Sequence, residues 1–295
     1  MTESLFRIDA PTEQDLVNFD RDGYIAYPDV MTDQGRQGLI DEVITREQVV
    51  EFLTMTEAER LQVKTPHRGN VNRLNAHGVH VRPWNNRGPW GFEMFDAPLV
   101  KALLLATVGP GVHMNHTTLH LTLRGERPIP LHHDMEPPNL EDRHKWFVFM
   151  LYYPNGFGLG DHNLRVIPGS HRIDDWGEHQ PYGPCAVPGR GESHKDCDMA
   201  ELLNELYGDQ VQRKLEVVEL ELPPGSMVFI NARTYHGVRP KPEDAPDQFR
   251  LFCNCTFSQA DSQGENIQTI PAQWLENADP WRRQLFDRPP FDEGA

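Results

Sequence analysis

Apolar residues recur at helical spacing in the first third of the chain and in short continuous runs after it. A helix is expected between Thr12 and Gly23, because the Thr12 hydroxyl can cap its first turn and glycine favours the backbone conformation that ends a helix. The same spacing predicts a second helix after Thr32 and a third at 98–108. A short strand is expected at 24–27.

After residue 115 the pattern changes to short runs of β-forming residues that Gly- and Pro-containing turns separate. Strands are expected at 116–123, 145–153, 163–167, 215–222, 227–231 and 249–257. Many short strands with such turns are typical of a sandwich or jelly roll, and not of alternating βαβ units. We therefore predict an all-β core with flanking helices, of the double-stranded β-helix (jelly-roll, cupin-like) class.

The chain contains no repeat and no linker that would divide it. A single domain is expected over 1–295, with a helical flank at about 1–110, the jelly-roll core at about 111–260 and a C-terminal extension at 261–295. Between 173 and 207 a Pro- and Gly-rich loop is expected to lead into one short helix at 199–206.

Charge and cysteine content narrow the classes of partner and location. The 28 basic and 44 acidic residues give a net charge of −16, which argues against binding nucleic acid or an anionic membrane surface. The apolar run at 99–106 is too short to span a membrane, the N-terminus lacks signal-peptide order, and four cysteines are too few for a disulfide scaffold. We expect a cytoplasmic protein with a small-molecule ligand, and no pattern indicates an oligomeric state.

Fourteen histidines are more than such a protein needs, and one of them forms a possible metal motif. Alternate residues of a strand share a face, so His132 and Asp134 can converge on one ion while His133 points away. His236, shortly after the strand at 227–231, is the best candidate for a third ligand. Two histidines and one carboxylate on one face of a metal form the site of non-haem Fe(II) oxygenases. A His-x-Asp pair alone can also arise by chance among so many histidines and acids.

A candidate anion-binding residue follows the third ligand. Arg250 opens the strand at 249–257, fourteen residues after His236. The Fe(II) in such a site binds 2-oxoglutarate, whose far carboxylate is costly to bury unpaired, and a planar guanidinium can hold it with two parallel hydrogen bonds. A surface arginine at a strand start is the simpler alternative, but the flanking Phe249 and Leu251 favour burial.

The remaining histidines and the neighbouring cysteines have simpler structural interpretations. His113, His116 and His120 are expected to be wall residues of a strand, and His171, after a Pro-Gly-Ser turn, to serve packing or ligand contact. Two more residues, Cys253 and Cys255, are expected to be small core residues.

Several segments together resemble one enzyme family. These are FDRDGYI at 19–25, the His132-x-Asp134 pair, NLRVIPGSH at 163–171, and the stretch from PGSMVF at 224–229 to YHG at 235–237. Over about 16–257 the chain resembles the phytanoyl-CoA dioxygenase family of Fe(II)/2-oxoglutarate-dependent oxygenases. The family usually places its arginine nearer the second histidine, so 241–247 is expected to be a small insertion. Related halogenases lack the metal carboxylate, so Asp134 disfavours halogenation.

The resemblance implies a reaction and a set of cofactors. Fe(II) held by His132, Asp134 and His236 would bind 2-oxoglutarate, Arg250 would hold the far carboxylate, and O2 would be the second cosubstrate. The products would be succinate, CO2 and an oxidised, by default hydroxylated, substrate. Two alternatives remain: a cupin-like metalloenzyme with non-oxidative chemistry such as an isomerase, and a non-catalytic metabolite-binding jelly roll.

One segment suggests the charge of the substrate. The segment 65–92, rich in Asn, Arg, Gly and Trp, is expected to be irregular, and 61–92 contains no acidic residue. It contains five basic residues and an aromatic residue suited to a flat ligand: Lys64, Arg68, Arg73, Arg82, Arg87 and Trp84. We expect a small anionic substrate recognised by at least one of the four arginines. Pairing of these arginines with acidic residues elsewhere in the fold is the alternative.

Overall fold

The computed structural model describes residues 4–62, 73–74, 77–81, 88–125, 128–134, 147–173, 199–242, 244, 249–259, 275–276 and 278–286. The helices are α1 (Glu13–Asp22), α2 (Asp33–Ile44), α3 (Glu47–Thr54), α4 (Glu57–Gln62), α5 (Pro89–Asp96), α6 (Pro98–Thr107), α7 (Met199–Val211) and α8 (Pro280–Phe286). The strands are β1 (Tyr24–Tyr27), β2 (Arg73–Leu74), β3 (Gly78–Val81), β4 (Val112–Thr122), β5 (Ile129–His132), β6 (Val148–Tyr153), β7 (Leu164–Val166), β8 (Val218–Glu219), β9 (Ser226–Asn231), β10 (His236–Val238) and β11 (Arg250–Gln259).

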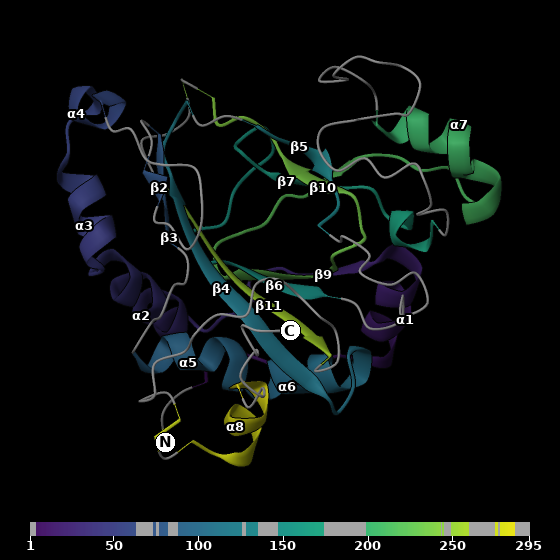
Figure 1. Cartoon of the computed structure of the whole chain (residues 1–295), viewed down its shortest axis with the longest axis horizontal. Helices are drawn as coiled ribbons and strands as arrows, with labels where there is room; N and C mark the ends of the chain where they lie inside the picture. The colour runs from purple at the N-terminus through teal and green to yellow at the C-terminus, as the bar shows by residue number, and fades with distance from the viewer. Residues whose placement is uncertain are drawn as a thin grey trace, which may run out of the picture.

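The strands form two antiparallel sheets that face each other, as Figure 1 shows. The larger sheet has the order β1-β9-β6-β11-β4-β3-β2 and the smaller one the order β5-β10-β7-β8. Strands that are distant in sequence pair within each sheet, for example β4 with β11 and β6 with β9. This arrangement is the predicted jelly roll.

Side-chain alternation gives the larger sheet two different faces. On β11, Leu251 and Cys253 pack into the main hydrophobic core with the helices, whereas Arg250 and Phe252 face the smaller sheet and line a cavity. Helices α2, α3, α5, α6 and α8 lie on the core side in Figure 1. The interior between the two sheets is therefore left for a ligand.

Local capping determines where the first elements begin and end. The Thr12 side chain accepts a hydrogen bond from the backbone N–H of Asp15, whose carboxylate accepts one from Thr12 N–H, and Gly23 ends α1 with a φ of 80°. The Thr32 side chain caps α2 by accepting a hydrogen bond from Gly35 N–H, without a reciprocal bond. The helices expected after Thr12 and Thr32 and at 98–108 are confirmed.

Two expectations about the fold, for 65–92 and 215–222, need correction, and the structure adds a helix to the C-terminal extension. The segment 65–92 contains β3, which extends the larger sheet because Val79 and Val81 are buried against the helices, and α5 begins at Pro89. The extension after 260 contains α8, whose Trp281 is buried and donates its indole N–H to Phe95 O over 2.9 Å. The strand expected at 215–222 is limited to β8. Each difference arises from pairing or packing with a distant part of the chain.

No helix in the described residues combines the length and the apolar character needed to cross a membrane.

Candidate metal centre and cavity

The two histidines of the candidate metal centre (His132, Asp134 and His236) face each other across a pair of strands. His132 is the last residue of β5 and is the direct antiparallel partner of His236, the first residue of β10, with ring centroids 4.7 Å apart. Gly237 makes this close approach possible, because a Cβ there would lie 2.7 Å from Ile129 O and 2.9 Å from Pro130 O. The two imidazoles are therefore brought together by backbone pairing.

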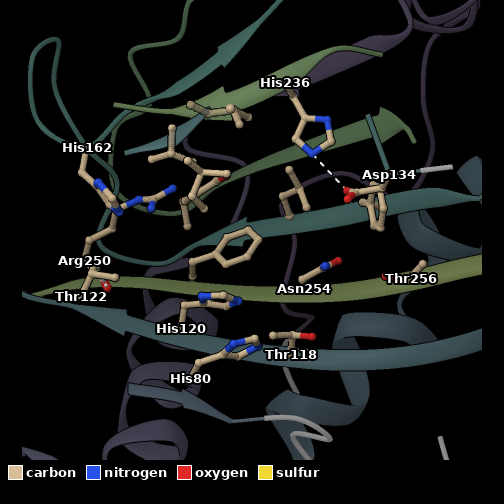
Figure 2. A pocket seen from close by; sticks show the side chains of 18 of the residues that line it. His80, Thr118, His120, Thr122, Asp134, His162, His236, Arg250, Asn254 and Thr256 are labelled. Carbon is tan, nitrogen blue, oxygen red and sulfur yellow. Dashed lines mark hydrogen bonds and ion pairs between the residues drawn. The ribbon is translucent and has the colours of Figure 1, made fainter. Parts of the chain in front are cut away.

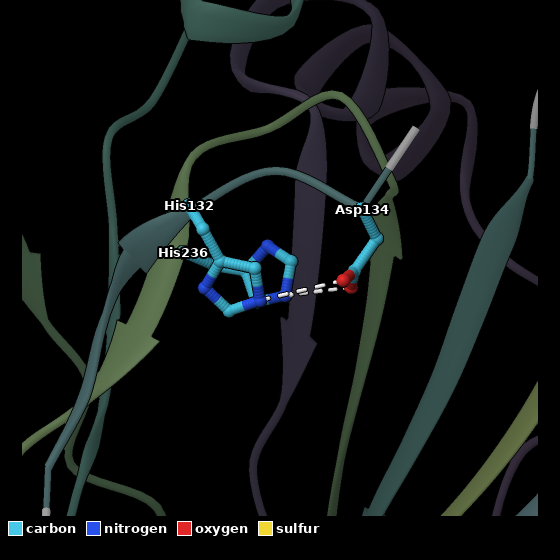
Figure 3. A group of neighbouring side chains, drawn as sticks. All are labelled: His132, Asp134 and His236. Carbon is cyan, nitrogen blue, oxygen red and sulfur yellow. Dashed lines mark ion pairs between the residues drawn. The ribbon is translucent and has the colours of Figure 1, made fainter. Parts of the chain in front are cut away.

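Asp134 reaches the centre from the loop after β5, and not from a continuing strand as expected. Its backbone N–H donates to Ala232 O over 3.0 Å, which ties this loop to the end of β9. Its carboxylate oxygens lie 3.3 Å from His132 Nε2 and 3.2 Å from His236 Nε2, as Figure 3 shows. The ligand atoms of all three residues lie within 4.8 Å of one another.

The backbone fixes which ring nitrogens face the carboxylate. His132 Nδ1 lies 2.8 Å from Pro130 O and His236 Nδ1 lies 2.8 Å from Thr234 O. Because a carbonyl only accepts, each Nδ1 carries a hydrogen, which leaves Nε2 as the ring atom that faces Asp134. With Nε2 deprotonated, the two rings and the carboxylate offer three acceptors to one position, which is the donor set that a divalent cation takes.

The electrostatics of the centre also favour a cation. Burial acts to raise the pKa of Asp134, but its contacts with His132 and His236 outweigh burial and hold that pKa below its ordinary value. The side chain of Asp134 is 41% exposed, so the open side of the centre faces the cavity. Burial acts to lower the pKa of His132, but Asp134 outweighs it and raises that pKa, so a cation bound here would displace a proton from the centre.

His133 lies away from this centre. It is buried and packs edge-on against Tyr235, with ring centroids 5.1 Å apart. Burial, with the neighbouring His132, lowers the pKa of His133 to about 3. It is therefore a neutral packing residue.

A cavity of about 550 Å³ extends from the metal centre between the two sheets, and Figure 2 shows its lining. One wall, from β3, β4 and β11, is rich in hydrogen-bonding side chains: His80, His116, Thr118, His120, Thr122, Asn254 and Thr256. Beside it in the same sheet, the β6 segment adds an apolar stretch to this wall: Phe147, Phe149, Leu151 and Tyr153. His116 and His120 are thus wall residues of β4, and their side chains face the cavity.

Arg250 lies at one end of this cavity and is 5% exposed. Its guanidinium carbon lies 5.1 Å from the ring centroids of Tyr153 and Phe157 and 5.7 Å from that of Phe252. Burial lowers the pKa of Arg250, although the guanidinium stays protonated at neutral pH. The interior therefore contains a full positive charge that aromatic faces compensate only in part.

The carboxylate of Asp161, which acts on the Arg250 charge, is already paired. Asp161 Oδ1 lies 2.6 Å from Lys241 Nζ, and Lys241 is 3% exposed. Within the described ranges no Asp or Glu forms an ion pair with Arg250, and its Nε has no hydrogen-bond partner there. Lys241, the first residue of the small insertion expected at 241–247, is buried.

The predicted substrate residues are described only in part. Arg68, Arg82, Arg87 and Trp84 lie outside the described residues, and Arg73 is described only as backbone in β2. His80, from β3 in the same segment, lines the cavity beside His120, with stacked rings 3.8 Å apart. The β3 part of the segment therefore borders the cavity.

Sequence reasoning missed some residues of the cavity. Asn254 shares the face of Arg250 because the two are four residues apart on β11, so strand alternation could have found it. His162 lies in a loop and gave no pattern. His171 lies outside the cavity lining and packs beside Gly23, with Nε2 3.1 Å from Asp20 O.

No protein-family model matches the chain, and no curated protein matches it. Several solved structures are similar to the chain. EctD from S. alaskensis, determined with 2-oxoglutarate and 5-hydroxyectoine, is 19% identical with a TM-score of 0.57, over 97% of this chain and 87% of that one. The chain shares the jelly-roll fold of this structure.

Two further structures show the same fold. SnoK, a non-heme alpha ketoglutarate dependent carbocyclase from nogalamycin biosynthesis, is 15% identical with a TM-score of 0.55, over 92% of each chain. The epimerase SnoN, in complex with Fe3+, alpha ketoglutarate and nogalamycin RO, is 14% identical with a TM-score of 0.55, over 88% of this chain and 94% of that one.

Proposed function

We propose that this protein is an Fe(II)- and 2-oxoglutarate-dependent oxygenase that oxidises a small molecule. One observation carries the proposal: a cation-binding centre and a buried guanidinium without a described carboxylate partner lie in the same cavity. A ligand that binds a metal at one end and presents a carboxylate at the other satisfies both. The solved structures that share the fold and contain 2-oxoglutarate support this ligand.

His132, Asp134 and His236 would hold the iron on one face and leave its other positions to the cavity. When bound, Fe(II) with 2-oxoglutarate and O2 supplies oxidising chemistry that releases succinate and CO2. The carbonyls of Pro130 and Thr234 keep both Nε2 lone pairs turned towards the metal position. The protein thus presents a preformed site.

Arg250 would bind the far carboxylate of the cosubstrate. Its burial removes the competition of water, so a carboxylate that forms two parallel hydrogen bonds with it is held in one orientation. The apolar side chains Phe149 and Leu151 keep water from the space between this arginine and the metal centre. A cupin with non-oxidative chemistry binds no 2-oxoglutarate and therefore does not require such an arginine.

The finer features of the proposal come from the sequence. The segments 19–25 and 163–171 support a place in the phytanoyl-CoA dioxygenase family, and hydroxylation is the proposed outcome. The excess of arginine in 61–92, together with the position of His80 in the wall, supports a small anionic substrate bound by Arg68, Arg73, Arg82 or Arg87 beside Trp84. A cytoplasmic location stays a prediction.

The decisive experiment is an anaerobic titration with Fe(II) and 2-oxoglutarate. A visible charge-transfer band should appear only when both are present, and candidate substrates should perturb it. A protein that binds Fe(II) but not 2-oxoglutarate is a non-oxidative metalloenzyme, and a protein that binds neither at micromolar concentration is a metabolite-binding jelly roll.

Substrate recognition is tested separately by changing each of the four arginines to Gln. At least one change should raise the substrate constant about tenfold, roughly the 1.4 kcal/mol of one ionic contact. The constant for 2-oxoglutarate should stay unchanged. If all four variants keep the wild-type substrate constant, the proposal that these arginines bind an anionic substrate is wrong.

A further inference from the structure

The backbone of His162 adopts a left-handed conformation that is unfavourable for a residue with a side chain. Its φ is 45°, and the other non-glycine residues with positive φ in the described chain are Asp29 at 47° and Gln212 at 55°. Asp29 and Gln212 are exposed, whereas His162 is 2% exposed and lines the cavity. Strain that is kept at a buried cavity position points to a role for the side chain.

The imidazole of His162 is held in one orientation. Its Nδ1–H donates to Arg239 O, and the backbone N–H of Arg239 donates to Asn163 O over 3.1 Å, so the loop is tied to the end of β10. Burial and the nearby positive charges of Arg250 and Lys241 lower the pKa of His162 to about 3. The ring is therefore neutral and cannot itself bind a carboxylate as a cation.

The ring of His162 lies at the end of the cavity that Arg250 occupies. Figure 2 shows His162 beside Arg250 at the end of the cavity that lies away from the metal centre. The residue before it, Asp161, is fixed by its ion pair with the buried Lys241. This end of the cavity is thus closed by a guanidinium that attracts an anion and by a neutral ring that occupies volume next to it.

We propose that His162 determines the chain length of the 2-oxo acid that the cavity accepts. A dicarboxylate that reaches from the metal centre to Arg250 fits, and one with an additional methylene would need the volume that the imidazole fills. Glycine would relieve the strain at this position but would open that volume. The inference rests on the proposed function, because it assigns the cavity to a 2-oxo acid.

The test compares the affinities of 2-oxoglutarate and 2-oxoadipate for the Fe(II)-loaded protein without oxygen, measured from the visible band. Wild type should bind 2-oxoglutarate at least about tenfold more tightly, the low end of what one methylene is worth in a closed pocket. In His162→Gly and His162→Asn this ratio should fall below about threefold. Glycine and asparagine both tolerate the left-handed conformation, so the melting temperature serves as the check on folding.

Asp29→Gly and Gln212→Gly are matched controls, because they relieve the same backbone conformation outside the cavity. Both should keep the wild-type ratio. If His162 were only structural, its variants would weaken both acids by the same factor, and an unchanged ratio in both variants overturns the inference. A wild-type protein that binds neither acid overturns the proposed function itself.

Discussion

Replacing Arg250 by alanine removes one side of the charge pair that the proposed cosubstrate would form. Since Arg250 is 5% exposed, solvent screens that pair very little. Truncating one partner of a desolvated, hydrogen-bonded charge pair costs about 2–5 kcal/mol. At about 1.4 kcal/mol per tenfold, the affinity for 2-oxoglutarate should fall about 30-fold to several thousand-fold. Arg250→Lys keeps the charge but not the planar guanidinium, so its affinity for 2-oxoglutarate should lie between those of wild type and Arg250→Ala.

The stability of the free protein should respond differently. Without a bound acid the guanidinium is a buried charge whose described neighbours are mainly the rings of Tyr153, Phe157 and Phe252. Its removal ends a desolvation cost, which offsets the packing that is lost. The melting temperature of metal-loaded Arg250→Ala without 2-oxoglutarate should therefore stay close to that of wild type.

The assay combines thermal unfolding with direct binding. For wild type, 2-oxoglutarate at one hundred times its Kd should stabilise the Mn(II)-loaded protein by about 2.7 kcal/mol, and this increment should fall below about 1 kcal/mol in Arg250→Ala at the same concentration. Metal affinity should not change, because Arg250 is not a ligand.

Arg239→Ala is the matched control. Arg239 is a nearby arginine whose side chain is 45% exposed and already forms an ion pair with Glu219. Its loss should leave the 2-oxoglutarate affinity unchanged. Wild-type affinity in Arg250→Ala, or an equal loss in Arg239→Ala, would refute the assignment of the carboxylate site.

Three further predictions concern the metal centre and the fold. Asp134→Ala should abolish binding of Fe(II), measured by titration, with no loss of stability in the metal-free protein. His133→Ala should keep metal binding and lower the free energy of unfolding by about 2 kcal/mol. The reverse pattern would show that the ligand register is wrong. Gly237→Ala should lower the free energy of unfolding by about 1–3 kcal/mol and weaken metal binding, because its Cβ would press on the β5 backbone. Gly208→Ala in α7 meets nothing within 4 Å and should stabilise by about 1 kcal/mol, so similar effects of the two changes would contradict the close approach. Burial lowers the pKa of His171 to about 4 from 6.5, so the unfolded chain takes up a proton that the folded protein excludes. The free energy of unfolding from urea titrations should therefore fall as the pH drops from 6.5 to 4, and His171→Gln should remove about 1.4 kcal/mol per pH unit of that slope.

The sequence alone determined those features that depend on local chemistry. Thr12 and Gly23 mark the ends of α1 because capping involves only neighbouring residues. The alternation of β-forming runs and turns also depends on neighbouring residues. It predicted the jelly roll because many short strands can bury their apolar faces only by packing together in sheets. The spacing of His132 and Asp134 and the position of His236 pointed to one site before their distances were known.

Other features were decided only by the tertiary structure, because they depend on what distant segments bring together. Asp134 reaches the metal centre from a loop, held by the carbonyl of Ala232 and not by strand alternation. The strand β3 forms because β4 offers it an edge, although its own segment shows no regular pattern. Asp161 is already paired with Lys241, which leaves the Arg250 charge to the cavity, and His162 lines the same cavity through a conformation that no local pattern predicts. Such pairings depend on which side chains and carbonyls meet across the fold, and spacing along the chain does not contain that information.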